Sequence, residues 1–123
     1  MSKVLNETIG TVGFDKLFVE NIPEADVVTV KLVAAGVVKR GTVVSGTPGG
    51  ADFAALSAAA SATKALYVLA EDCDTAADPV GIAYRTGHFN RNALIVGAGY
   101  ALTAADEEIL RKSGILLADA IEY

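Results

Sequence analysis

The fold is decided by two stretches, Leu66-Tyr67-Val68-Leu69-Ala70 and Val80-Gly81-Ile82-Ala83-Tyr84-Arg85-Thr86-Gly87. The first is a short apolar run rich in β-forming residues, and it ends at an acidic turn, Glu71-Asp72-Cys73-Asp74-Thr75. The second alternates as a half-buried strand does. One face of this alternation carries Val80, Ile82 and Tyr84. Both stretches therefore predict β-strands, separated by a turn.

Further strands are expected upstream. Residues 27–34 place Val28, Val30 and Leu32 on one face of a strand, while Thr29 and Lys31 fall on the other. Residues 37–45 predict a strand, a turn at a glycine and a second strand. Residues 46–50 (Gly-Thr-Pro-Gly-Gly) predict a loop. Residues 51–66 leave two possibilities open, because their alanines favour a short helix but their apolar periodicity is poor, which suits a compact loop.

The strongest local prediction is a helix near the C-terminal end. Thr103 suits the N-cap, and Asp106 three residues later approximates a capping box. Acidic residues fill the first turn and basic residues the last, as the helix dipole favours. Gly114 suits the C-terminal cap. The face expected to pack on a sheet carries Ala105, Ile109 and Leu110.

Together these patterns predict an α+β fold, a small β-dominated domain with one C-terminal helix. We expect the short strands to form a small barrel or sandwich. Residues 1–25 are predicted to form an N-terminal arm, and residues 26–123 a single β-rich domain.

Composition excludes several functional classes. The chain has 123 residues, a formal net charge of −5 and 52% hydrophobic residues, which is typical of a globular domain. No stretch forms the basic face that nucleic acid requires. No apolar run approaches the ~18 residues of a membrane span. The first residues lack the apolar core of a signal peptide, so we expect the protein in the cytoplasm or in a particle assembled there.

The sequence offers little for catalysis. Cys73 is the single cysteine and His88 the single histidine, so an intrachain disulfide and a CxxC site are excluded and zinc ligands are few. The acidic turn at 71–75 lacks the further oxygen ligands and the glycine spacing of a calcium loop. We therefore expect no catalytic residue, no metal and no cofactor.

An apolar patch near the N-terminus is open to two interpretations. Phe14, Leu17 and Phe18 suit a core, but an N-terminal segment with β character can also add to the sheet edge of a neighbouring molecule.

The segment Leu69-Ala70-Glu71-Asp72-Cys73-Asp74-Thr75 resembles the "I-L-x-E-D-V-D-A" segment of phage head decoration proteins, the lambda capsid-stabiliser type. The upstream strand Gly41-Thr42-Val43-Val44 and the downstream stretch 83–90 are similar to that family. So is the ending, from Thr103 to Asp119. The resemblance covers about residues 37–119. The Ala-rich loop between Val44 and Tyr67 departs from it, and phage head fibre proteins resemble the chain through a similar acidic turn and glycine-containing strand.

The resemblance implies a structural protein that binds the major capsid protein on the outer surface of the expanded head. Such proteins assemble as trimers and clamp neighbouring capsomers against internal pressure, and their N-terminal segment pairs with the shell. Transferred here, the candidate capsid contacts are Phe14, Leu17 and Phe18. The candidate subunit contacts in a homotrimer are His88, Phe89, Asn90 and Arg91. Nucleic acid and membrane are not expected as partners, and the protein would reside in the virion.

Two alternatives stay open. One is another virion component, such as a head fibre base or a tail module. The other, from a different class, is a small hydrolase or ligand-binding domain that uses His88, Tyr84 and the acidic turn. It predicts a concave pocket with perturbed titratable groups.

Overall fold

The structure is a computed structural model, and it describes residues 17–20, 25–61 and 63–118. One α-helix is described, α1 (Ala104–Lys112), with a single 3₁₀ turn, η1 (Arg91–Ala93). The described strands are β2 (Phe18–Glu20), β3 (Asp26–Lys31), β4 (Val37–Val38), β5 (Val43–Gly46), β6 (Ala54–Ala55), β7 (Ala65–Leu69), β8 (Cys73–Asp74), β9 (Val80–Asn90) and β10 (Ile115–Ala118).

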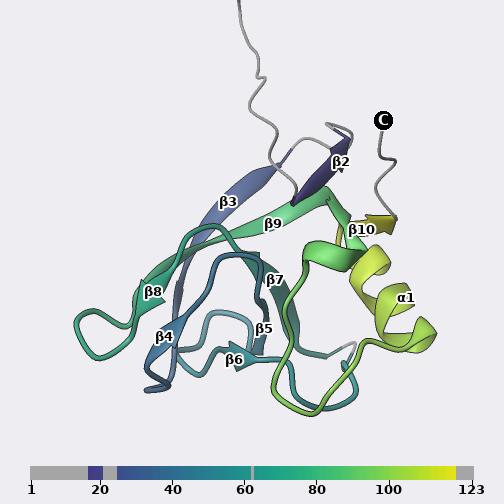
Figure 1. The fold of residues 1–123 in the computed structure, drawn as a ribbon. Coiled ribbons are helices and arrows are strands. Elements are labelled where there is room, and N and C mark those ends of the chain that lie inside the picture. Colours follow the sequence, from purple (N-terminus) through teal and green to yellow (C-terminus); the bar gives the residue numbers. More distant parts are fainter. Residues whose placement is uncertain (1–16, 21–24, 62, 119–123) are drawn as a thin grey trace, which may run out of the picture.

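Strand β9 is the centre of the molecule (Figure 1). It has 11 residues and pairs with four other strands. Its first half pairs antiparallel with β3 on one side and with β7 on the other. Its second half pairs antiparallel with β2 and parallel with β10. One long strand therefore links the two halves of the fold.

The predicted class is confirmed: a small β-dominated domain with one helix near its C-terminal end. The main sheet has seven strands, with β10-β9-β7-β5-β6 along its path and with β2 and β3 beside β9. A separate two-stranded sheet joins β4 to β8. The path ends at β10 and at β6, so the strands of the described residues do not close into a barrel. Residues 18–20, which we expected in an arm, form a strand of this sheet.

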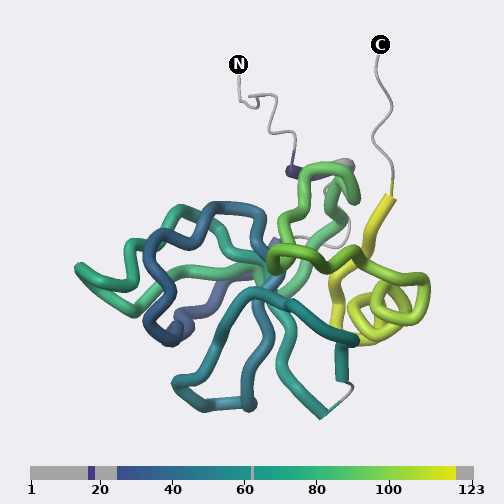
Figure 2. Tube along the Cα trace, turned by 60° about the horizontal axis from the view of Figure 1, so that its bottom comes forward, coloured from purple at the N-terminus to yellow at the C-terminus, as the bar shows by residue number. Residues whose placement is uncertain are grey.

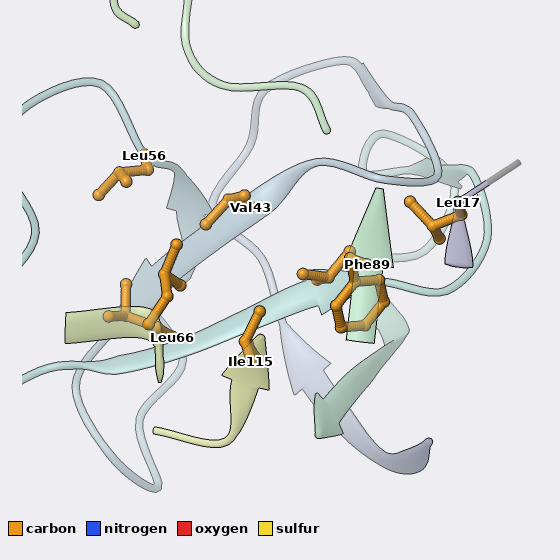
Figure 3. Packing of buried hydrophobic residues seen from close by; sticks show 8 residues of the cluster. Leu17, Val43, Leu56, Leu66, Phe89 and Ile115 are labelled. Carbon is orange, nitrogen blue, oxygen red and sulfur yellow. The ribbon is translucent and has the colours of Figure 1, made fainter. Parts of the chain in front are cut away.

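The core has two parts along β9. The first lies under α1 and β10 and is shown in Figure 3. Its fully or nearly buried side chains are Leu17, Val43, Leu56, Leu66, Val68, Phe89, Leu110 and Ile115. The second lies under β3 and contains Val30, Leu32, Val44, Phe53, Leu69, Cys73 and Ala83. Adjacent residues of β5 serve different clusters because successive side chains of a strand point to opposite faces.

The helix begins as predicted. The Thr103 side chain accepts from the backbone N–H of Asp106, and the Asp106 carboxylate accepts from the N–H of Thr103, which completes a capping box. Gly114 follows the helix with a φ of 102°, which favours glycine. The predicted packing face is wrong in one position: Leu110 is fully buried and Ile109 half-buried, but Ala105 is exposed.

The face of β9 that carries Val80 and Ile82 is exposed, and the small residues Gly81 and Ala83 form the buried face in this half of the strand. The strand, turn and strand predicted over residues 37–45 are present as β4 and β5. They do not pair with each other, because β4 pairs with β8 while β5 pairs with β6 and β7. Of the two possibilities left open for residues 51–66, the described part of this stretch has no helix. It contains β6, loops and the first residues of β7. The apolar run after the helix forms strand β10.

Candidate interaction surfaces

The predicted subunit-contact stretch, 88–91, lies where β9 ends. The pairing of β9 with β10 places His88 opposite Leu116 and Asn90 opposite Ala118. On the other edge of β9, the N–H of Asn90 donates to the carbonyl of Leu17 at 2.7 Å. The first described residue, Leu17, and the last, Ala118, therefore lie next to Asn90 on opposite edges of β9.

Side chains of this stretch have different surroundings. Phe89 is fully buried, so it is a core residue and offers no surface to another subunit. Asn90 accepts from the N–H of Asn92 and so begins the η1 turn. Arg91 forms two hydrogen bonds with the Glu107 carboxylate, at 2.8 and 2.9 Å. The stretch is thus partly internal, and its outward groups face the helix α1.

The predicted capsid contacts are also used inside the chain. Leu17 is 4% exposed and belongs to the first core cluster, because its side chain packs beneath the end of β9. Phe18 is half-buried, and its ring lies 5.0 Å from the rings of both Phe89 and Tyr84. The Leu17 side chain is therefore packed inside the chain itself, and a capsid contact at this residue stays a prediction. Phe14 lies outside the described residues.

A hollow of about 380 Å³ lies between α1 and β10. Its charged and polar lining comes from His88, Glu107, Glu108 and Arg111, and its apolar lining from Ala104, Leu116 and Leu117. Glu108 and Arg111 form an ion pair along the helix, and the Arg111 guanidinium lowers the pKa of the Glu108 carboxyl below its ordinary value. Leu116 and Leu117 point to opposite faces of β10, as neighbouring residues of a strand do. Since the hollow is lined by both, it extends around the outer edge of β10.

The acidic turn at 71–75 is bonded to the backbone of residues 36–40. Asp72 accepts from the backbone N–H of Arg40 at 2.7 Å, and Thr75 donates to the carbonyl of Gly36 at 2.8 Å. The Cys73 side chain is buried, and burial, reinforced by nearby carboxylates, raises the pKa of its thiol. The turn holds the strand pair β4–β8 against the body of the domain.

The residues of the proposed hydrolase or ligand site do not come together. Cys73 lies against Gly81, near the start of β9. His88 is seven residues further along the same strand, which is about 20 Å at the ordinary rise of a strand. Tyr84 packs in the aromatic cluster with Phe18 and Phe89. The acidic turn and the histidine therefore belong to opposite ends of β9.

Sequence reasoning identified Asp106 as a capping residue and missed its other partners. Asp106 is 1% exposed, and it accepts hydrogen bonds from the N–H of Ala60, from the N–H of Thr103 and from the hydroxyl of Tyr100. Burial alone would raise the pKa of Asp106, but these donors lower it below its ordinary value. The capping pattern located this residue, but its partner Ala60 is too far away in the sequence to be found by spacing.

The segments that carry the family resemblance lie together. The N–H of Gly41 donates to the carbonyl of Leu69 at 2.8 Å, and the N–H of Leu69 donates to the carbonyl of Thr42 at 2.9 Å. At the other end of β9, the N–H of Gly87 donates to the carbonyl of Gly114 at 3.1 Å. Stretches widely separated in the sequence are therefore direct neighbours in space.

No model of a known protein family matches the sequence, and no curated protein matches it either. Among residues 17–20, 25–61 and 63–118, no helix is long and apolar enough to cross a bilayer. In the same part of the chain, no three histidine, cysteine, aspartate or glutamate side chains are grouped to hold a metal ion.

Proposed function

We propose that the protein decorates the outer surface of an expanded phage head, where it binds the major capsid protein as a homotrimer and stabilises the shell. The protein would act by binding alone, with no catalytic step. Three subunits held together can each make a modest contact, and the contacts reinforce one another because they form simultaneously.

The observation that carries this proposal is the arrangement of the resembling segments. Residues 41–44 and 69–75 are joined by backbone hydrogen bonds, and Asp72 of the acidic turn caps the backbone just before Gly41. A resemblance by chance has no reason to select stretches that form one structural unit. This arrangement supports the family resemblance on which the proposed function rests.

The residues before β2 are the candidate shell contact. Residues 1–16 join the domain through Leu17, whose side chain is buried and whose carbonyl accepts from Asn90. A pull on this segment would therefore be transmitted to the central strand β9. The proposal therefore keeps Phe14 as a candidate shell contact, while Leu17 and Phe18 pack within the domain and would anchor the segment.

The test is binding of the purified chain to expanded, decoration-free capsids, with unexpanded shells as the control. Saturable binding to expanded shells alone is the expected result. A truncation should remove only residues 1–16, because a longer deletion would take Leu17 out of the core. We expect the truncated chain to stay folded and to bind at least about tenfold more weakly, which corresponds to about 1.4 kcal/mol.

A matched control separates contact from anchoring. Phe14→Ser should weaken shell binding and leave the melting temperature unchanged, whereas Phe18→Ser should lower the melting temperature because its ring packs on Phe89 and Tyr84. Absence of binding to either shell would reject decoration and would favour a head fibre base or a tail module.

A further inference from the structure

Strand β2 is paired with one strand of the domain, β9. It has three residues, and its pairing with β9 shifts register between Phe18 and Glu20. Strand β3, by comparison, pairs with β9 over six residues. Among the described strands, none pairs with the other side of β2, which lies at the edge of the molecule in both views (Figures 1 and 2). Detaching β2 would therefore break no pairing between the other described strands.

Two side chains and a backbone hydrogen bond join β2 to the domain. The Phe18 ring packs on the rings of Phe89 and Tyr84, with centroids 5.0 Å apart in both pairs. The carbonyl of Leu17 accepts from the N–H of Asn90 at 2.7 Å, and the Leu17 side chain is buried. These contacts are made at the start of β2 and at the end of β9, so they are lost together when β2 leaves its place.

The rest of the domain has its own packing and pairing. Leu17 lies at one end of the first core cluster, beside Phe89, and Leu66 lies at the other end (Figure 3). The other members of this cluster pack between β5, β7, β9, α1 and β10. On the side of β9 that faces away from β2, the N–H of Gly87 donates to the carbonyl of Gly114, directly before β10. Detaching β2 therefore removes the end of the cluster and leaves its middle intact.

We propose that β2 is a strap that detaches from β9 as a unit while the rest of the domain stays folded. A segment held by few contacts opens at a lower free energy than the whole fold. Detachment frees residues 17–20 to continue the segment before them, which adds about 13 Å of extended chain. Tension on residues 1–16 acts first on Leu17, so it would favour the detached state. The strap goes beyond the proposed function and does not depend on binding to a capsid.

The experiment is native-state hydrogen exchange of the full chain, followed by NMR at increasing urea concentrations below the unfolding transition. The Asn90 amide reports on the strap because it donates to Leu17, and the Leu69 amide reports on the whole fold because it donates to Thr42. We expect Asn90 to be protected at least about tenfold less than Leu69, with little dependence on urea, because a local opening exposes little surface. The Gly87 amide is the control for fraying of β9 and should stay protected.

A pair of variants distinguishes detachment of the strap from unfolding of the whole domain. Val44→Ala removes buried methyl groups from the second core cluster, which stays packed when β2 detaches. It should therefore lower the protection of Leu69 at least about tenfold and leave the protection of Asn90 unchanged. Phe18→Leu weakens a ring contact that is lost in both kinds of opening, so it should lower the protection of both amides by the same factor.

Three results would overturn the strap. In the wild type, Asn90 could be protected as strongly as Leu69 or more strongly, with the same dependence on urea. In the Val44→Ala variant, both amides could lose protection by the same factor. Loss of Gly87 protection together with that of Asn90 would show that the end of β9 opens as a whole. All three are measured without capsids, so the proposed function keeps its own binding test.

Discussion

Replacing Asp106 by asparagine tests whether one buried carboxylate joins the helix to two distant loops. The side chain accepts from Ala60 of the Ala-rich loop, from Tyr100 of the loop before the helix and from Thr103 at the N-cap. An asparagine has one acceptor oxygen, and its NH₂ group would face a backbone N–H that also donates. At least one donor therefore loses its partner.

The magnitude follows from the charge of the acceptor. A hydrogen bond to a charged group contributes about 1.5–3 kcal/mol, and the bonds that remain to asparagine lose their charge assistance. We expect Asp106→Asn to lower the free energy of unfolding by about 2–4 kcal/mol. For a domain of this length that is a decrease in melting temperature of roughly 8–16 °C.

The assay is urea unfolding followed by circular dichroism, repeated from neutral to acidic pH. The folded-state pKa of Asp106 is below its ordinary value of 3.8, so the ionised form stabilises the fold above that pH. This stabilisation is lost as the pH falls through the folded-state pKa. The difference in the free energy of unfolding between the wild type and Asp106→Asn should therefore disappear below about pH 4.

The control is Glu108→Gln, which removes an exposed carboxylate from the same helix and should change stability much less. The reasoning is refuted if Asp106→Asn is as stable as the wild type at neutral pH. A difference that persists unchanged into acid would refute the assigned pKa direction.

Three further predictions concern other groups. The hydrogen bond to Asp106 raises the pKa of Tyr100 above 10.0, and ultraviolet titration should show a downward shift in the Asp106→Asn variant. Gly87→Ala should cost about 2–4 kcal/mol in urea unfolding, because φ there is 156° and a Cβ would lie 2.8 Å from the Phe89 ring. Cys73 should react with a maleimide far more slowly in native protein than in denaturant, measured by mass, since burial raises the thiol pKa.

Each of these predictions has a contrary outcome. Gly49 has a φ of 76°, but a Cβ there would meet no other atom within 4 Å, so Gly49→Ala should cost less than Gly87→Ala, about 1–2 kcal/mol. Equal costs would mean that steric contact with Phe89 is unimportant. An unchanged Tyr100 titration in the Asp106→Asn variant would show that the hydrogen bond to Asp106 does not raise the Tyr100 pKa. Rapid labelling of Cys73 in the native protein would show that the acidic turn at 71–75 opens readily.

Local chemistry explains what the sequence predicted. The capping box was predictable because Thr103 and Asp106 are three residues apart and interact within one turn. Strands β7 and β9 were predictable because short runs rich in β-forming residues carry their own pattern. The burial of Asp106 was not predictable, since it depends on the N–H of Ala60, 46 residues away.

The candidate contacts show the same limit. Phe89 and Leu17 were expected to face partners, but both are buried because β2 and β10 enclose the end of β9. Hydrophobic character alone does not distinguish a core residue from a contact residue. The pairing of β10 with β9 decides between them, and it depends on a parallel connection through α1 that no local pattern specifies.

Strand β9 shows why alternation alone does not tell which face of a strand is buried. Gly81 lies inward because the core is close there: a Cβ at this position would already touch the sulfur of Cys73 and the side chain of Leu69, each at 3.4 Å. The larger Val80 and Ile82 are consequently outside. Residue size along this half of β9 therefore follows the space that the core leaves at each position, and not the alternation of hydrophobic residues in the sequence.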